Sequence, residues 1–189
     1  PPAYFRLVDK SKVAVIGSQR PWIDVEDLGK SKFVYYSARD GLQIPAIITL
    51  PAGFEEGQKA KGAIIVPHGG PWARDSAGFD SSGWTQYFAS RGYIIMQPQY
   101  RGSDGWGRAL WRAGDGEWGQ KMQDDKDDGA AWLVETGYVD AHKIALHGLS
   151  FGVFDRFAAS LCPTRPYPLN LTGGRRCAVA TAATDRADQ

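Results

Sequence analysis

The chain has 189 residues, of which 43% are hydrophobic and 23% charged, and its formal net charge at pH 7 is +1. This length fits one domain with a sizeable core or part of a longer protein, and the near-neutral charge gives no support to nucleic acid or a membrane surface as a partner. No apolar run reaches the length that spans a bilayer. No signal peptide opens the chain, which slightly favours a cytoplasmic location, although the first residue is not methionine. Cys162 and Cys177 lack a metal-binding spacing and are expected to fill the core.

The first 30 residues differ in character from the rest of the chain. Two short apolar runs, 4–8 and 13–17, lie on either side of a polar turn and predict a pair of strands. A connector with Arg20, Pro21 and Trp22 comes next. We interpret residues 1–30 as the end of a preceding domain with its linker, and residues 31–189 as part of a second domain.

Strands and helices alternate in this second domain. Such alternation predicts an α/β fold with a mainly parallel sheet, here opened by an antiparallel hairpin. The predicted elements are, in chain order, a hairpin over 33–38 and 42–50 with an Asp40-Gly41 turn, a strand at 63–66, a helix capped by Ser81-Ser82 and ended by Gly92, a strand at 93–96, a Gly- and Trp-rich excursion at 102–119, a helix at about 123–135, a strand from Lys143, a helix to about 162 and a strand at 177–180.

The pentapeptide Gly148-Leu149-Ser150-Phe151-Gly152 directly follows the apolar run at 143–147. The pattern G-x-S-x-G between a strand and a helix is typical of a nucleophile elbow, where a sharp turn lifts the serine hydroxyl clear of the sheet. Glycine on both sides is a steric requirement, because the turn leaves no room for side chains beside the serine. The backbone N–H of the next residue would then face a developing oxyanion.

A second glycine-rich segment, Pro67-His68-Gly69-Gly70-Pro71, directly follows the strand predicted at 63–66. Acyl transfer in such hydrolases uses two oxyanion donors, one N–H after the nucleophile and one from a glycine-rich loop after an earlier strand. We therefore expect this loop to supply the second donor. An ordinary Gly-Gly turn is the structural alternative.

These two motifs belong to a longer series of blocks, from about Phe33 to Gly152, that resembles the catalytic domain of the prolyl oligopeptidase family of serine peptidases. The acylaminoacyl-peptidase and dipeptidyl-peptidase relatives resemble it most. The matching blocks are Asp40-Gly41-Leu42, His68-Gly69-Gly70-Pro71, Gln86-Tyr87-Phe88-Ala89-Ser90-Arg91-Gly92-Tyr93, Tyr100-Arg101-Gly102-Ser103-Asp104-Gly105-Trp106-Gly107, Trp118-Gly119, Asp124-Asp125, Gly137-Tyr138-Val139-Asp140 and the pentapeptide around the serine.

The resemblance implies an α/β-hydrolase fold and roles for four residues. Ser150 is the implied nucleophile, and Gly70 and Phe151 are the implied oxyanion donors through their backbone N–H groups. Trp72, which follows the Gly-Gly-Pro turn, either borders the pocket for a substrate side chain or packs ordinarily. A β-propeller commonly precedes this domain in the family, and residues 1–30 are similar to its last strands and linker. No metal or cofactor is implied.

A complete catalytic triad is missing from the chain. In α/β-hydrolases the triad residues follow the order Ser, Asp, His, whereas all three histidines here precede the serine. His142 is expected at the wrong edge of the sheet, His147 in the packing, and His68 within the oxyanion loop, where a general base is disfavoured. Asp185 and Asp188 follow the serine, but the family's acid comes after a later strand. We therefore expect a C-terminally truncated fragment of a longer enzyme.

The sequence also leaves the family pattern just after the elbow. Val153 stands where family members usually have another glycine, and the proline-rich run at 163–168 comes after it. A local frame error or a divergent insertion over residues 153–175 would each explain this departure.

Two further patterns have structural explanations. The acidic run at 124–128 fits a helix N-terminus, where the macrodipole favours negative charge, better than a cation site, and some of its aspartates are candidates to anchor the preceding loop. Four tryptophans are expected to pack the loop and helix onto the sheet rather than to stack on a ligand. These are Trp106, Trp111, Trp118 and Trp132.

The sequence thus predicts a serine peptidase that acts on oligopeptides or acylated peptides through an acyl-enzyme on Ser150, with its Asp and His downstream. Two alternatives stay open. One is a carboxylesterase or lipase-like hydrolase with the same machinery, which fold and elbow do not separate from a peptidase. The other is a catalytically silent hydrolase-like module. Neither nucleic acid nor a membrane is an expected partner.

Overall fold

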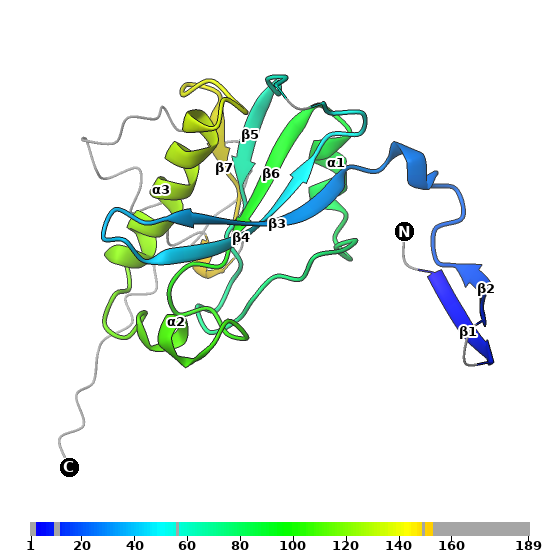
Figure 1. Cartoon of the computed structure of the whole chain (residues 1–189), viewed down its shortest axis with the longest axis horizontal. Helices are drawn as coiled ribbons and strands as arrows, with labels where there is room; N and C mark the ends of the chain where they lie inside the picture. Colours follow the sequence, from blue (N-terminus) through cyan, green and yellow to red (C-terminus); the bar gives the residue numbers. More distant parts are fainter. Residues whose placement is uncertain (1–2, 10–11, 56, 149, 153–189) are drawn as a thin grey trace, which may run out of the picture.

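The computed structural model describes residues 3–9, 12–55, 57–148 and 150–152 (Figure 1). Strands β1 (Ala3–Asp9) and β2 (Lys12–Ser18) form an antiparallel pair, as predicted, and make up a two-stranded sheet of their own. The assignment of this pair to a preceding domain stays a prediction. The helix predicted to about 162 and the strand predicted at 177–180 lie outside the described residues.

A five-stranded sheet forms the body of the structure, with the strand order β3-β4-β6-β5-β7. The pairs β3/β4 and β4/β6 are antiparallel, and β6/β5 and β5/β7 are parallel. This arrangement confirms the antiparallel hairpin at the start of the sheet. With β4 and β6 also antiparallel, the described sheet is mixed rather than mainly parallel. The strands are β3 (Lys30–Ser37), β4 (Gln43–Leu50), β5 (Gly62–Ile65), β6 (Tyr93–Pro98) and β7 (Ile144–Leu146).

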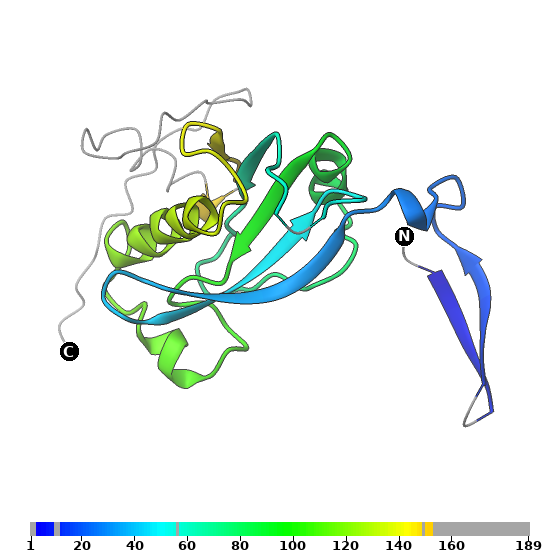
Figure 2. The same cartoon turned by 45° about the horizontal axis from the view of Figure 1, so that its top comes forward.

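Helices cover both faces of this sheet (Figure 2). Helix α1 (Trp84–Ala89) connects β5 to β6, and α3 (Lys121–Glu135) connects β6 to β7. A 3-10 turn, η1 (Val25–Asp27), precedes β3, and a short helix, α2 (Arg108–Arg112), interrupts the Gly- and Trp-rich excursion, where the sequence patterns predict no helix. No described helix combines the length and the apolar character needed to cross a bilayer.

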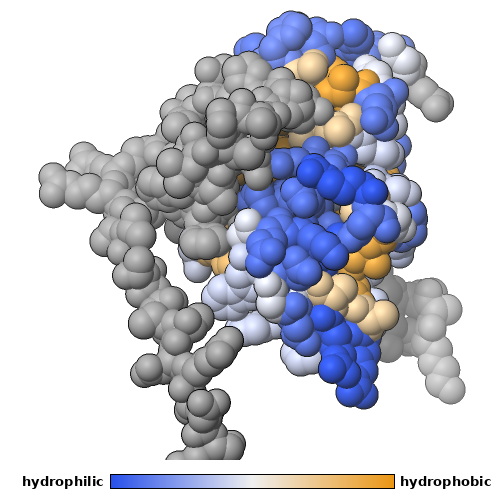
Figure 3. Space-filling model, turned by 90° about the vertical axis from the view of Figure 1, so that its left-hand side faces the viewer, coloured by the Kyte–Doolittle hydropathy of each residue, from blue (hydrophilic) through white to orange (hydrophobic). Residues whose placement is uncertain are grey.

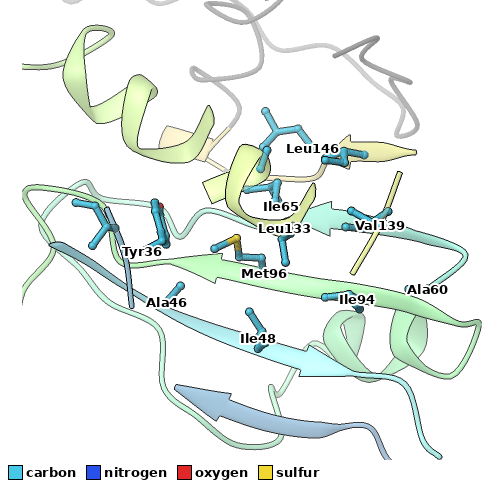
Figure 4. Packing of buried hydrophobic residues seen from close by; sticks show 14 of the residues in the cluster. Tyr36, Ala46, Ile48, Ala60, Ile65, Ile94, Met96, Leu133, Val139 and Leu146 are labelled. Atoms are coloured by element: carbon cyan, nitrogen blue, oxygen red, sulfur yellow. The ribbon is translucent and has the colours of Figure 1, made fainter. Parts of the chain in front are cut away.

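The main hydrophobic core lies between the sheet and α3 (Figure 4). Alternate residues of each strand face it, because successive side chains of a strand point to opposite faces of the sheet. Ile48 of β4 and Met96 of β6 are fully buried there, together with Leu133 of α3. This packing fixes α3 against the sheet and thereby fixes the loops on either side of the helix.

The start of α1 differs from the prediction. The helix begins at Trp84 after Gly83, which has φ = 76° and makes no side-chain cap. The Asp80 carboxylate accepts hydrogen bonds from the backbone N–H groups of Gly83 and Thr85, the latter at 2.8 Å. Ser82 Oγ accepts from the Trp84 N–H at 3.4 Å and donates to the Asp80 carboxylate at 2.7 Å. The predicted capping role therefore holds for Ser82, and Asp80, which the prediction did not include, supplies the shorter bonds to this helix end.

The topology gathers three loops at one edge of the sheet. Strand β5 lies between its parallel neighbours β6 and β7, so the segments that follow these three strands leave at the same edge. The chain passes from β5 to one side through α1 and later returns to the other side through α3. Ligands of open α/β sheets bind at such a switch point, outside the carboxyl ends of the strands.

Candidate active site

Ser150 lies on the tight turn that follows β7. Its φ of 58° makes it the one non-glycine residue with positive φ in the described part of the chain. Its side chain is exposed, and the helical residues Phe151 and Gly152 follow it directly. Such a backbone conformation is costly for a residue with a Cβ atom, and it recurs where a strand-to-helix turn presents a nucleophile.

The glycines on either side of this turn have no room for a side chain. A Cβ atom on Gly148 would lie 2.6 Å from the carbonyl oxygen of Gly152. A Cβ atom on Gly152 would lie 2.9 Å from the carbonyl oxygen of Pro67. The predicted steric requirement is thus confirmed at both positions, and the second contact brings the elbow against the loop that follows β5.

That loop contains the predicted oxyanion donor Gly70. Gly70 has φ = 130°, and a Cβ atom there would lie 2.7 Å from the backbone nitrogen of Trp72, so only glycine fits the turn. The Gly70–Pro71 peptide bond is cis. The fold therefore brings the two glycine-rich motifs together, while the oxyanion roles of Gly70 and Phe151 stay predictions.

His68, in the same loop, is buried and held by other groups. Its Nδ1 lies 2.7 Å from the Gly69 carbonyl oxygen, and its Nε2 lies 2.8 Å from Ser103 Oγ. The Tyr100 hydroxyl donates to the His68 carbonyl oxygen at 2.9 Å, and the two rings stack 4.5 Å apart. Burial lowers the pKa of His68 to about 4, so the ring is neutral at pH 7. These contacts give His68 a structural role, consistent with the low expectation of a general base there.

The other two histidines are also accounted for. The ring of His147 packs against Trp84 and Phe88, with centroid distances of 5.4 and 5.7 Å. His142 is exposed in the turn before β7, at the end of that strand opposite Ser150. Both placements agree with the predictions. Asp185 and Asp188 lie outside the described residues.

A row of aromatic rings runs from the elbow to the exposed surface. Phe151 contacts Trp118 edge to face, with centroids 5.5 Å apart, and Trp118 contacts Trp72 at 5.4 Å. The exposed fractions of Trp72 and Trp118 are 54% and 44%. Trp118 therefore packs against neighbouring rings, as predicted, but it stays half exposed beside the residue that follows Ser150. The prediction holds for Trp106 and Trp132, which pack against the main core.

Trp111 differs from the predicted packing, since it is 41% exposed. It belongs to α2, the short helix that the sequence patterns missed. An isolated tryptophan in a glycine-rich segment carries no periodic signal, so sequence reasoning has no means of separating packed from exposed rings here.

A charged network beneath the site joins three segments. The backbone N–H, Nε and Nη2 of Arg101 donate to the buried Asp125 carboxylate, and Nη1 and Nη2 donate to Asp40 in the hairpin turn. Burial acts to lower the pKa of Arg101, but its hydrogen bonds to both carboxylates outweigh burial and leave the pKa raised. Hydrogen bonds from Arg101 lower the pKa of Asp40 to about 2. Burial raises the pKa of Asp125, and Arg101 opposes that shift. The three N–H donors of Arg101 favour the ionised form of Asp125, so that the two side chains form a charged pair.

The acidic run in α3 therefore anchors the surrounding chain, which confirms one of its two predicted explanations. Asp128 accepts from the backbone N–H and side chain of Arg39, at 2.7 and 2.8 Å. Asp124, in the first turn of α3, also pairs with Arg39 at 3.0 Å. In the described residues, no group of three or more His, Cys, Asp or Glu side chains is placed to hold a metal ion.

Comparison with known proteins gives the family. Residues 79–160 match the Prolyl oligopeptidase family. Dipeptidyl aminopeptidase BIII of Pseudoxanthomonas mexicana is 35% identical over 159 residues, which cover 80% of this chain and 23% of that protein. Dipeptidyl peptidase family member 6 of Caenorhabditis elegans is 32% identical over 78% of this chain and 22% of its own length. The chain belongs to the prolyl oligopeptidase family.

Solved structures of prolyl oligopeptidase relatives have the same fold. A puromycin hydrolase is 28% identical with a TM-score of 0.71, over 82% of this chain and 24% of that one. A puromycin-hydrolyzing peptidase of Mycobacterium tuberculosis is 27% identical with a TM-score of 0.72, over 84% and 25%. The predicted α/β-hydrolase fold is thereby confirmed. The chain spans about a quarter of the length of the relatives that it matches.

Proposed function

We propose that the chain is part of a serine peptidase that hydrolyses peptide bonds of oligopeptides, with Ser150 as nucleophile. The backbone of Ser150 carries this proposal: φ is 58° on an exposed turn, between two glycines that have no room for a Cβ atom. A turn of this shape presents a hydroxyl for attack on a carbonyl group. The relatives named dipeptidyl aminopeptidase and dipeptidyl peptidase support a peptide as substrate.

The proposed reaction has two steps. Ser150 Oγ attacks the carbonyl carbon of the scissile bond while a base takes the hydroxyl proton, and the N–H groups of Gly70 and Phe151 donate to the oxygen that becomes negative. The C–N bond then breaks, the amine leaves with the proton, and an ester remains on Ser150. Water attacks this ester, which releases the carboxylic acid and restores the serine hydroxyl.

The base and the acid that orients it are proposed to be a histidine and an aspartate further along the polypeptide. His68 does not suit the role of base, since both ring nitrogens lie within hydrogen-bond distance of other groups and burial lowers its pKa to about 4. His147 packs against aromatic rings instead. This order of residues agrees with the α/β-hydrolase pattern of Ser, then Asp, then His.

Trp72 and Trp118 are proposed to contact an apolar side chain of the substrate. Both rings are about half exposed, and they connect through Phe151 to the residue that would attack. Large aromatic surfaces in contact with water are well suited to bind apolar groups, because binding removes that surface from water.

A fluorophosphonate probe, which labels activated serines, tests the proposal. We expect the full-length protein to be labelled at Ser150 and its Ser150→Ala variant to lose labelling. Absence of labelling in the full-length protein, or unchanged labelling of the variant, would overturn the assignment of the nucleophile. The 189-residue chain tested in parallel separates an active unit from one that needs residues outside it.

Parallel assays with matched peptide anilides and esters then decide the substrate class. We expect kcat/KM for the peptide anilide to fall at least tenfold in Trp118→Ala, through a higher KM. Trp111→Ala, an exposed tryptophan on α2, serves as the matched control and should change kcat/KM less than twofold. Turnover of esters alone would favour a carboxylesterase.

A further inference from the structure

Lys126 is a buried lysine in the middle of α3, with 2% of its surface exposed. Its Nζ lies 3.9 Å from the ring centroid of Tyr100 and 5.0 Å from that of Phe151. A buried ammonium group needs compensation for lost water, and the negative faces of aromatic rings attract a cation strongly when water is excluded. The rings of Tyr100 and Phe151 therefore both interact with the ammonium group of Lys126.

These two rings belong to the two segments that form the candidate site. Phe151 directly follows Ser150. Tyr100 donates its hydroxyl hydrogen to the carbonyl oxygen of His68 and stacks on the imidazole ring, so it holds the start of the loop that carries Gly70. Tyr100 and Phe151 also stack on each other, with centroids 6.0 Å apart. Lys126 thus lies against a pair of stacked rings that connects the two loops.

The position of Lys126 is itself fixed by its neighbour in sequence. Asp125 is fully buried and accepts hydrogen bonds from Arg101, while its backbone carbonyl oxygen accepts from the Tyr36 hydroxyl at 2.6 Å. Tyr36 lies in β3, at the far edge of the sheet. These hydrogen bonds anchor helix α3 at Asp125, and they thereby fix the backbone position of Lys126, the next residue.

We propose that Lys126 is a positioning residue of the oxyanion hole. Its ammonium group fixes the Phe151 ring and, through Tyr100, the loop from His68 to Gly70, so that the two proposed N–H donors keep their spacing. This inference rests on the proposed function for its kinetic consequence. The structural consequence, a rigid pair of loops, is measured without any substrate.

Lys126→Met tests the proposal, because methionine keeps most of the side-chain volume and removes the charge. Lys126→Gln is the second variant, and Lys121→Met is the matched control, since Lys121 lies on the same helix but is exposed and pairs with Asp40 and Glu117 at the surface. All variants are made in the full-length protein. Melting temperatures identify the variants that fold.

Hydrogen exchange of the Gly70 and Phe151 amides gives the first readout. We expect exchange at least tenfold faster in both Lys126 variants and unchanged in the control. Unchanged exchange in a folded Lys126 variant would overturn the proposal, whether or not the protein is a peptidase.

Kinetics give the second readout. With peptide substrate, we expect kcat to fall at least tenfold and KM to change less than twofold in both Lys126 variants, because donors that have lost their spacing stabilise the transition state less and the bound substrate equally. A lysine that only supports the fold would lower the melting temperature and leave kcat of the folded protein unchanged, which would also overturn the proposal. Failure of the wild-type protein to react with a fluorophosphonate would count against the proposed function, while hydrogen exchange would still decide the role of Lys126.

Discussion

The backbone at Ser150 is the most constrained feature of the candidate site. A serine with φ = 58° stores strain that the surrounding structure must offset. Gly148 and Gly152 make this offset feasible, because each lets another backbone segment approach to within a distance that a side chain would block. The turn therefore depends on the lack of side chains at Gly148 and Gly152, and a single methyl group at either position is enough to disturb it.

Gly152→Ala tests this constraint. The new Cβ atom would lie 2.9 Å from the Pro67 carbonyl oxygen, so the elbow must move away from the loop after β5. We expect a loss of about 1–3 kcal/mol in the free energy of unfolding, as for other overpacked sites, and at least a tenfold slower reaction with a fluorophosphonate. Gly17→Ala is the control, since a Cβ atom there meets nothing within 4 Å. Equal effects of the two substitutions would contradict the steric explanation.

Sequence reasoning reaches the backbone of the site but not the side chains around it. Glycine spacing carries a local steric meaning, so the elbow and the loop at Gly70 are recognisable from the amino-acid sequence alone. The half-exposed ring of Trp118 and the buried charge of Lys126 depend on which residues of distant segments meet them. A lysine in a run of aspartates suggests a solvated surface, and only the fold shows that Lys126 is turned toward two aromatic rings.

At the scale of elements, α3 is the part that joins the site to the rest of the sheet. Its inner face packs Leu133 into the main core, and its N-terminal half makes the network of Arg101, Asp125 and Asp40. That network ties the hairpin turn, the loop after β6 and the helix together. The ends of the helix are predictable to within about two residues, because apolar periodicity is a local signal. Its ion pairs with Arg101 and Arg39 are not, since those residues lie 24 to 89 positions away.

Arg101→Met tests the network. The substitution leaves Asp125 buried without its cation, and breaking a buried pair in this way costs about 3–5 kcal/mol. Arg39→Met is the matched control, because Arg39 pairs with Asp124 and Asp128 of the same helix and its side chain is more than half exposed. We expect the control to cost about 0–1 kcal/mol. Urea unfolding measures both, and a cost of Arg101→Met no larger than that of the control would rule out this account.

At the scale of the whole molecule, the buried His68 and the partly buried Asp75 give stability opposite dependences on pH. Burial lowers the pKa of His68 from 6.5 to about 4, so its contribution is complete above pH 6.5 and is lost as the pH falls toward 4. Burial raises the pKa of Asp75 from 3.8 to about 6, so its ionisation destabilises the fold above pH 6, and this cost disappears as the pH falls toward 3.8. Each difference corresponds to roughly 3 kcal/mol.

We therefore expect these two contributions to cancel nearly between pH 6 and pH 4. Asp75→Asn removes the contribution of Asp75 and leaves that of His68, so the free energy of unfolding of this variant should decrease on acidification across this range. His68→Gln leaves the contribution of Asp75, so the free energy of unfolding of this variant should increase on acidification over the same range. Unfolding measured at several pH values checks both signs, and parallel pH profiles for the two variants would contradict the assignment. The pairing of Arg101 with Asp40 changes stability only at lower pH. Its contribution is complete above pH 3.8 and is lost as the pH falls toward 2, because Arg101 lowers the pKa of Asp40 to about 2.

Viewed from the side on which α3 lies, most of the described surface is hydrophilic, with small apolar areas between (Figure 3). Exposed aromatic residues occur elsewhere as well, on β3 at Phe33 and Tyr35, where both contact Trp106.

The pairing of β7 with β5 has a consequence for the order of assembly. Ile144–Leu146 align with Ala63–Ile65, roughly eighty positions earlier, and this pairing holds the strand from which the serine turn begins. Contacts between residues so distant in sequence form late in folding, since the two ends of a long loop must first meet. In a nascent chain in which the hairpin, β5 and β6 have already joined, the pairing that holds the start of the serine turn has yet to form. The proposed nucleophile therefore gains its strained backbone conformation only after β7 has paired with β5.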